Sequence, residues 1–177
     1  ALRDTTLAAS GFLVTDRIGG PSVVPRLPDG MLPQAFTNFV QPESSGDDLY
    51  RRGLYTQWRR TGHYPTFATF AAPSREFCLV ARERSNTPLQ ALTLLNDEAY
   101  VEMAMAFAER ILTEAKGTPE AKISYAYKTA LGRAPRTAET SYLRRLILKR
   151  LTYFEINPKE AANLIANTKG WKMPKEM

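Results

Sequence analysis

The chain has 177 residues, of which 44% are hydrophobic and 24% charged, and this ordinary globular composition excludes a chain that is disordered throughout. Its 24 Lys and Arg residues outnumber its 18 Asp and Glu residues, and the net charge of +6 permits an acidic partner without identifying one. Because Cys78 is the single cysteine, the chain cannot form an internal disulfide. The single histidine, His63, argues against a zinc site built by this chain alone. No apolar run is long enough to span a bilayer.

The first 73 residues are expected to be mostly irregular. A short helix is predicted from Asp4 to Leu13, ending near Gly11. From Arg17 to Asp48, repeated prolines and Gly- and Ser-rich runs rule out a regular helix, because each proline removes a backbone donor and restricts the residue before it. Scattered apolar side chains indicate that this segment packs over the core as a belt.

Residues 49–60 fit two patterns. Tyr50, Leu54 and Trp58 recur at every fourth position, as on a helix face, whereas Leu54, Thr56 and Trp58 alternate as on a strand. Gly53 weakens the helix, and the aromatic content favours a strand or extended chain. Residues 61–73 are expected to form a loop.

The best-marked helix start lies at Thr87. Thr87 and Gln90 have the spacing of a capping box, and Pro88 falls at the first helical position, where its missing N–H costs nothing. Such a cap stabilises a helix by about 1 kcal/mol. The leucines that follow are expected to be buried in a short helix: Leu89, Leu92, Leu94 and Leu95.

Similar signals mark further helices. The predicted helices are 98–116 with Asp97 as its cap, 119–131 between Thr118 and Gly132, 138–154 capped by Thr137, and a last short helix from Asn157-Pro158 to about Asn167. Their expected inner faces are Val101, Met105, Ala108 and Leu112, then Ile123, Ala126, Tyr127, Ala130 and Leu131, then Tyr142, Leu143, Leu146, Ile147, Leu151 and Phe154.

The predicted fold class is therefore mainly α. An antiparallel, bundle-like helical C-terminal half follows a long irregular Pro- and Gly-rich N-terminal half, with room for one short strand pair. Residues 1–177 are expected to form a single domain, with an irregular lead-in over 1–73, a helical core over 74–168 and a tail over 169–177. Because the chain begins with Ala1 rather than Met, we expect a fragment of a larger protein.

Interleaved charges dominate the stretch SREFCLVARERSN. They are Arg75, Glu76, Arg82, Glu83 and Arg84. Arginine forks match carboxylate and phosphate groups, so the cluster is compatible with a site for an anionic ligand. Both signs alternate and no Gly-rich phosphate loop lies nearby, which favours a salt-bridge network that fastens the irregular half to the helices.

A second candidate combines basic and aromatic side chains: Arg51, Arg52, Trp58, Arg59 and Arg60. This combination is typical of a platform for a single-stranded nucleic acid or a glycan. Aromatic anchors with snorkelling arginines produce the same pattern in a domain that binds neither.

For two smaller groups of residues we favour a structural role over a functional one. Cys78 lies between Phe77 and Leu79, where a buried inert thiol is more common than a Cys78–His63 catalytic pair. The basic residues of the predicted helix 138–154 are most simply a solvated face: Arg144, Arg145, Lys149 and Arg150.

Four stretches of the chain carry a family resemblance. They are LRDTTLAASG with IGGPSV, then RRGLYTQWRR, then TFAAPSREFCLVARERSNTPLQALTLLND, and then YKTALGR with the Pro135 and Thr137 that follow it. With these stretches, which cover most of residues 2–140, the chain resembles the planctomycete-type domain of unknown function 1553.

The resemblance implies a C-terminal portion of a large exported protein that often has a cytochrome-c-like or carbohydrate-binding module upstream. A periplasmic or extracellular location follows, and any haem would belong to the upstream module, so no cofactor is expected in this chain. The family brings no established activity or catalytic residue. Relatives have Asp in a Thr-Phe-Asp-Ala-Pro run where this chain has Ala71, so a catalytic or metal-binding role of that carboxylate would be lost here, whereas a structural role would survive.

Three functional hypotheses follow. The favoured one is a non-catalytic accessory domain that associates with other domains or proteins, or with an anionic glycan, and it predicts that Arg75, Arg82 and Arg84 are satisfied internally. The second is a hydrolytic or redox enzyme acting on polysaccharide, which requires these arginines to converge with His63 in an open cleft. The third is a nucleic-acid binder, which the mild charge excess does not favour and which requires one exposed face made of Arg51, Arg52, Arg59 and Arg60.

Overall fold

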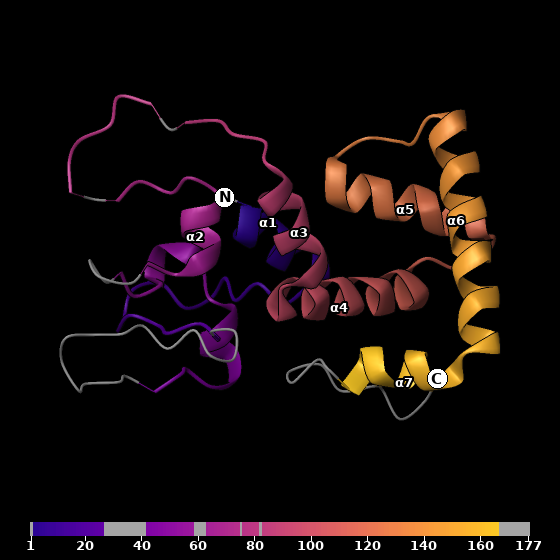
Figure 1. Ribbon diagram of the computed structural model, residues 1–177, viewed down its shortest axis with the longest axis horizontal. Coiled ribbons are helices and arrows are strands. Elements are labelled where there is room, and N and C mark those ends of the chain that lie inside the picture. The colour runs from indigo at the N-terminus through magenta and orange to yellow at the C-terminus, as the bar shows by residue number, and fades with distance from the viewer. Residues whose placement is uncertain (1, 27–41, 59–62, 75, 82, 167–177) are drawn as a thin grey trace. The chain divides into compact units, whose positions relative to one another are not determined.

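The computed structural model describes residues 2–26, 42–58, 63–74, 76–81 and 83–166, and over these residues the chain is mainly helical (Figure 1). The α-helices are α1 (Leu2–Ser10), α2 (Pro65–Thr69), α3 (Pro88–Asn96), α4 (Glu98–Glu114), α5 (Pro119–Leu131), α6 (Thr137–Ile156) and α7 (Pro158–Ala166). Two short 3₁₀ helices, η1 (Gly46–Tyr50) and η2 (Gly53–Tyr55), precede α2. The prediction of a mainly α fold is confirmed.

The chain divides into two compact units. The first unit consists of residues 1, 3 and 13–101, and the second of residues 2, 4–12 and 102–177. The predicted tail, residues 169–177, lies outside the described residues.

In the first unit, residues 49–60 were predicted to form a strand or extended chain. Their described part contains no strand: Arg51 and Thr56 are extended, but Gly53–Tyr55 forms the 3₁₀ helix η2. Tyr55 donates its N–H to the Arg52 carbonyl at 2.9 Å, which closes the tight turn of η2. Extended pairing is limited to two isolated parallel bridges among the described residues, Val14 with Arg51 and Val23 with Thr56. The turn at Gly53 interrupts the alternation before a ladder can form.

The expected loop over residues 61–73 contains a helix, α2. Pro65 occupies its first turn, where a proline is favoured. Its C-terminus is closed by two turn hydrogen bonds, from Ala71 N–H to the Ala68 carbonyl at 3.1 Å and from Ala72 N–H to the Phe67 carbonyl at 2.8 Å. This is the Schellman arrangement, and it places Ala71 in the left-handed region at φ 50°.

The capping box of α3 is present as predicted. The Gln90 N–H donates to the Thr87 hydroxyl at 3.3 Å, and the Thr87 N–H donates to Gln90 Oε1 at 3.2 Å. The predicted burial of the leucines of α3 is wrong, because Gln90 is the buried residue of this helix. The leucines are exposed instead: Leu89, Leu92, Leu94 and Leu95.

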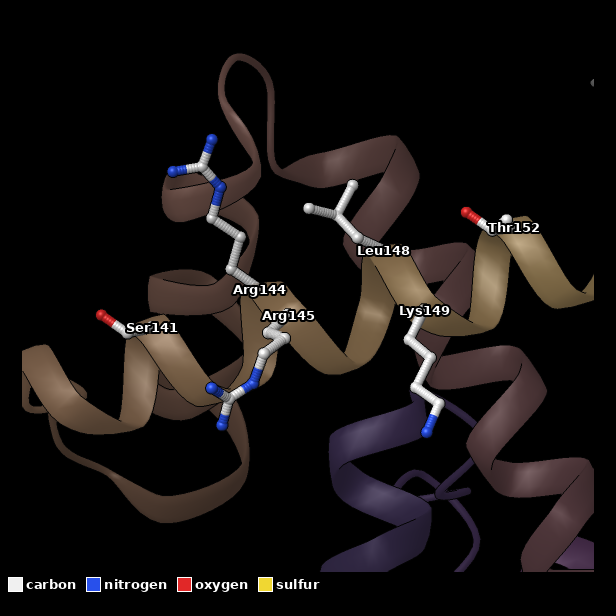
Figure 2. A pocket seen from close by; sticks show the side chains of 6 residues that line it. All are labelled: Ser141, Arg144, Arg145, Leu148, Lys149 and Thr152. Carbon is white, nitrogen blue, oxygen red and sulfur yellow. The ribbon is translucent and has the colours of Figure 1, made fainter.

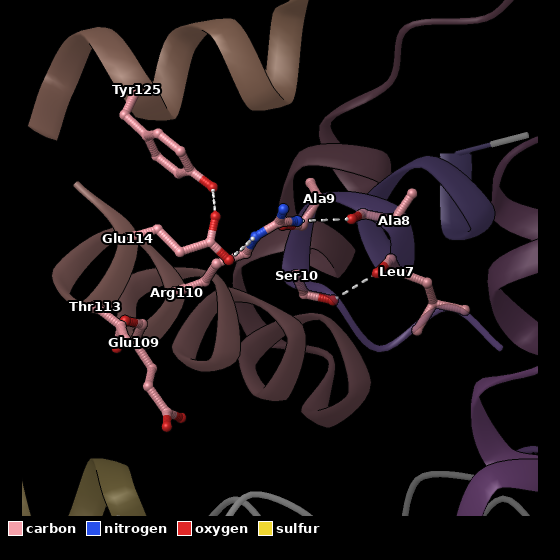
Figure 3. Close-up of polar contacts among 9 residues, drawn as sticks. All are labelled: Leu7, Ala8, Ala9, Ser10, Glu109, Arg110, Thr113, Glu114 and Tyr125. Atoms are coloured by element: carbon pink, nitrogen blue, oxygen red, sulfur yellow. Dashed lines mark hydrogen bonds and ion pairs between the residues drawn. The ribbon is translucent and has the colours of Figure 1, made fainter.

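In the second unit, polar contacts connect α1, α4 and α5 (Figure 3). The Arg110 guanidinium on α4 donates to the carbonyls of Ala8 and Ala9, at 3.3 and 3.1 Å. These carbonyls belong to the last turn of α1, where carbonyl oxygens have no N–H donor within the helix. Arg110 also pairs with Glu114 at 3.0 Å, and Glu114 accepts a hydrogen bond from the Tyr125 hydroxyl on α5.

The buried face of α4 differs from the predicted one. Met103 and Ala106 are buried in the second unit, whereas Leu112 of the predicted stripe is 51% exposed. Apolar residues occur on every side of this helix between positions 103 and 108, so the helical period alone does not select a face.

The ends of α5 and α6 follow local chemistry. Thr118 caps α5 by accepting from the Ala121 N–H at 3.3 Å, and Gly132 ends the helix at φ 68°. The cap of α6 is Arg136 rather than the predicted Thr137, because Glu139 accepts from the Arg136 N–H at 2.7 Å. Arg133 and this N–H together lower the pKa of Glu139 to about 2.

α6 contacts both the helix that precedes it in the chain, α5, and the helix that follows it, α7. Its predicted inner face is not buried, since α6 contains no buried residue. On α5, Ile123 is buried as predicted, whereas Leu131 is 59% exposed.

Candidate functional site

The most exposed apolar part of the first unit is held at both ends by hydrogen bonds. Trp58 donates its indole N–H to the Ser74 carbonyl at 3.0 Å, which fastens the beginning of the segment. The Gln90 amide donates to the Thr69 carbonyl at 2.9 Å and to the Ser85 hydroxyl at 2.8 Å, which fastens the end. Gln90 thus ties the start of α3 to the end of α2.

Between and beyond these anchors lies a run of exposed apolar side chains, which we call the display segment: residues 76–81 and 83–95. Phe77 is 65% exposed, Leu79 is 47% exposed and Val80 is fully exposed. Further along the chain, the leucines of α3 are exposed as well: Leu89, Leu92, Leu94 and Leu95. Large apolar side chains that are exposed in one stretch of the chain make it a candidate binding surface.

The charged members of the display segment are exposed as well. Glu76, Glu83 and Arg84 lie at the surface, and none of them forms an ion pair with another described residue. Arg75 and Arg82, the remaining members of the predicted cluster, lie outside the described residues. The predicted salt-bridge network therefore stays a prediction for those two arginines. Cys78, expected to be buried, is exposed.

The arginines predicted to form a platform occupy different environments. Arg51 is 2% exposed, donates to the carbonyls of Gly19 and Pro21, and lies 4.2 Å from the centre of the Tyr55 ring. Arg52 is exposed, and Arg59 and Arg60 lie outside the described residues. The side chain of Arg51 is thus used inside the first unit.

Arg3 extends the same interior network. Its guanidinium donates to the Arg51 carbonyl at 2.6 Å and to the Leu49 carbonyl at 2.5 Å. Arg3 is 7% exposed, and sequence reasoning did not single it out. Its position in an amphipathic N-terminal helix gives no signal, because its partners are backbone carbonyls more than 40 residues away.

His63 and Trp58 form part of an aromatic cluster. Their ring centres lie 4.8 Å apart, and Trp58 also stacks on Phe67 at 5.9 Å. The His63 Nε2 is buried and makes no hydrogen bond with the residues that the structure describes. Trp58 and His63 therefore support the loop that leads into α2.

A group of buried titratable side chains lies in the first unit. Burial raises the pKa of Tyr64, and the negative charge of Asp97 raises it further. Burial likewise raises the pKa of Tyr100, with Tyr64 and Asp97 adding to the effect. Asp97 caps α4 by accepting from the Ala99 N–H at 2.9 Å, and burial raises the pKa of its carboxyl as well.

Ala71 stands where relatives are expected to have Asp. Its φ of 50° is left-handed, a region that Asp and Asn tolerate better than Ala does. An Asp at this place would therefore suit the turn that ends α2. The local backbone thus supplies a structural reason for the residue type without invoking chemistry.

Two further observations bound the site. No helix in the described part of the chain has the length and apolar character needed to cross a bilayer. Over the same residues, His, Cys, Asp and Glu side chains do not gather in groups of three or more that would hold a metal ion.

The fold and the site together define a mainly helical domain that presents an anchored apolar segment. The model of the family described as "PSD1: Protein of unknown function (DUF1553)" matches residues 1–147, and the chain belongs to this family. No curated protein and no solved structure matches the chain.

Proposed function

We propose that this chain is a non-catalytic interaction domain of an exported multidomain protein. Its display segment docks against an apolar surface of another domain of the same polypeptide or of a partner protein. The supporting observation is the exposure of Phe77, Val80 and the leucines of α3 on a segment that Trp58 and Gln90 hold in place.

Removing the exposed apolar side chains of the display segment from water would drive such docking. Burying apolar surface is favourable by roughly 25 cal/mol per Å², so a partner that covers the display segment gains this term without refolding the chain. The anchors lower the ordering cost, since the contacts of Trp58 with Ser74 and of Gln90 with Ser85 are already made before a partner binds. Exposed Glu76, Glu83 and Arg84 provide the polar rim that such interfaces have.

A location outside the cytoplasm is part of the proposal. It is supported by the resemblance to the C-terminal portions of exported proteins and is independent of the geometry of the display segment.

The experiment replaces Leu92, which is 56% exposed, by the photo-crosslinking amino acid p-benzoylphenylalanine in the full-length protein in its native host. Irradiation is expected to produce adducts that mass spectrometry maps to an apolar stretch of another domain or of one partner. Combining the probe with Phe77→Ser and Leu95→Ser is expected to abolish the adducts while the circular dichroism spectrum is unchanged.

The matched control places the same probe at Leu164 on α7, which is 44% exposed and belongs to the second unit. Few adducts are expected there. Equal yields at the two positions, no adduct at position 92, or adducts that survive the double serine variant would each refute the docking surface.

A further inference from the structure

A second surface, in the second unit, has a different chemistry. A shallow hollow with a volume of about 510 Å³ runs along α6 (Figure 2). Its lining residues are Ser141, Arg144, Arg145, Leu148, Lys149 and Thr152. They recur at intervals of three and four residues, so they share one face of the helix over a length of about 16 Å.

The side chains shape this hollow into a trough. Figure 2 shows Arg144 and Leu148 pointing to one side of the helix and Arg145 and Lys149 to the other. The hydroxyls of Ser141 and Thr152 lie towards the two ends. Cations thus stand on both flanks of the trough, and Leu148 lies on the same flank as Arg144 (Figure 2).

Most of this positive charge is not neutralised within the unit. Arg144 pairs with Glu120 of α5 at 3.2 Å, and both side chains are substantially exposed. Arg145 lies 6.0 Å from the centre of the Tyr142 ring, and neither it nor Lys149 pairs with an acid among the described residues. A carboxylate is therefore already bound at one flank, and the other flank retains two cations.

We propose that the α6 trough binds an acidic peptide segment of a partner protein, one that combines carboxylates with an apolar side chain. The carboxylates pair with Arg145 and Lys149, and the apolar side chain packs on Leu148, which is 56% exposed. The positive charge of the trough favours an anionic ligand. Leu148 favours a peptide among such ligands, because anionic glycans and nucleic acids have no aliphatic side chain to pack against it. The trough accommodates about five extended residues, at roughly 3.3 Å each.

This surface is separate from the display segment, and neither proposal depends on the other. The test uses the 177-residue chain and fluorescence anisotropy with a labelled peptide composed of Glu and Leu. A Glu/Ser peptide of equal length and charge reports on the leucine contact. Heparin and oligo(dT) serve as unlabelled competitors.

The Glu/Leu peptide is expected to bind more tightly than the Glu/Ser peptide, and added salt is expected to weaken binding of both. Arg145→Glu with Lys149→Glu should weaken binding about tenfold or more, because two attractions become repulsions. Leu148→Ser should remove the preference for the Glu/Leu peptide. Arg145→Gln with Lys149→Gln provides a milder pair if the double reversal disturbs the fold.

The control is Lys116→Glu with Lys159→Glu, which makes the same change in net charge at exposed positions outside the trough. It should leave binding unchanged. The proposal fails if this control weakens binding equally, if the two peptides bind alike, if heparin or oligo(dT) outcompetes the peptide at equal charge concentration, or if no peptide binds.

Discussion

The two units use arginine in opposite ways. In the first unit, Arg3 and Arg51 are buried and donate to backbone carbonyls of irregular chain. In the second unit, Arg144 and Arg145 lie on the open face of α6. The difference follows from where the backbone hydrogen bonds are made.

A helix satisfies its own carbonyls, whereas an irregular segment leaves carbonyls without partners unless a side chain supplies donors. A guanidinium group carries five donors and therefore serves several carbonyls at once. Arg110 shows the same principle in the second unit, because its acceptors are the carbonyls at the end of α1. Arginines of the second unit that are not needed in this way remain available at the surface.

The largest expected effect is at Arg51. Arg51→Ala leaves the carbonyls of Gly19 and Pro21 without their donor and should lower the free energy of unfolding by about 3 kcal/mol. Arg145→Ala, at an exposed position, should change it by about 0.5 kcal/mol or less. Urea unfolding of both variants measures the contrast, and equal losses would contradict the division between the units.

The next effect concerns Arg110. Arg110→Met removes the donor to Ala8 and Ala9 and should cost about 1 to 2 kcal/mol, with faster amide hydrogen exchange in α1. Glu114→Gln is the matched control, because it disrupts the ion pair and leaves the carbonyl contacts in place. If Glu114→Gln accelerates exchange in α1 as much as Arg110→Met does, the carbonyl contacts are not the cause.

Two helix ends offer an opposed pair of substitutions. Ala71 ends α2 at φ 50° and Gly132 ends α5 at φ 68°, both in the left-handed region. Ala71→Gly should raise stability and Gly132→Ala should lower it, each by about 1 kcal/mol, since Ala pays a steric penalty there. Apart from Gly132 itself and its chain neighbours, the described residues leave open space around a Cβ at this position, so the change measures backbone conformation. Thermal unfolding that shifts in the same direction for both variants would refute this explanation.

The smallest expected effect is a pH dependence in the polar interior of the first unit. Burial raises the pKa of the Asp97 carboxyl above its ordinary value of 3.8, so the folded chain binds this proton more readily than the unfolded chain. Stability from this group is therefore complete below pH 3.8 and is lost as the pH rises through the raised value. Asp97→Asn should accordingly melt at a higher temperature than the wild type at neutral pH.

The two melting temperatures should converge as the pH falls below 3.8, where Asp97 is protonated in both states. Asn retains the side-chain oxygen that accepts from the Ala99 N–H, so the cap of α4 is preserved. A difference that persists unchanged across this pH range would assign the effect to packing instead of charge.

Helix starts were predictable because their signals act over a few residues. Thr87, Thr118 and Asn157 each precede a proline, and a helix follows each pair. Gly132 ended α5 as expected. The cap of α6 was misplaced by one residue because Glu139, not the Thr137 hydroxyl, satisfies the first free N–H.

Burial was not predictable to the same degree. The leucines of α3 were expected in the core, but Gln90 is the buried residue because its amide has partners on α2 and in the preceding loop. Cys78 was likewise expected to be buried, because its neighbours Phe77 and Leu79 are apolar, but it is exposed. A hydrophobic side chain is more stable when buried, but it is buried only where the fold places other side chains against it.

The sequence by itself determined that the chain is mainly helical, where most of its helices begin and end, and which family it belongs to. The helix boundaries depend on contacts within about four residues, such as the capping box at Thr87, and the family follows from the match of residues 1–147 to its model. Only the tertiary structure decided that Arg3 and Arg51 lie inside and that Leu92 lies outside. Those outcomes depend on which distant carbonyls and side chains the fold brings near each residue, and a linear pattern does not contain that information.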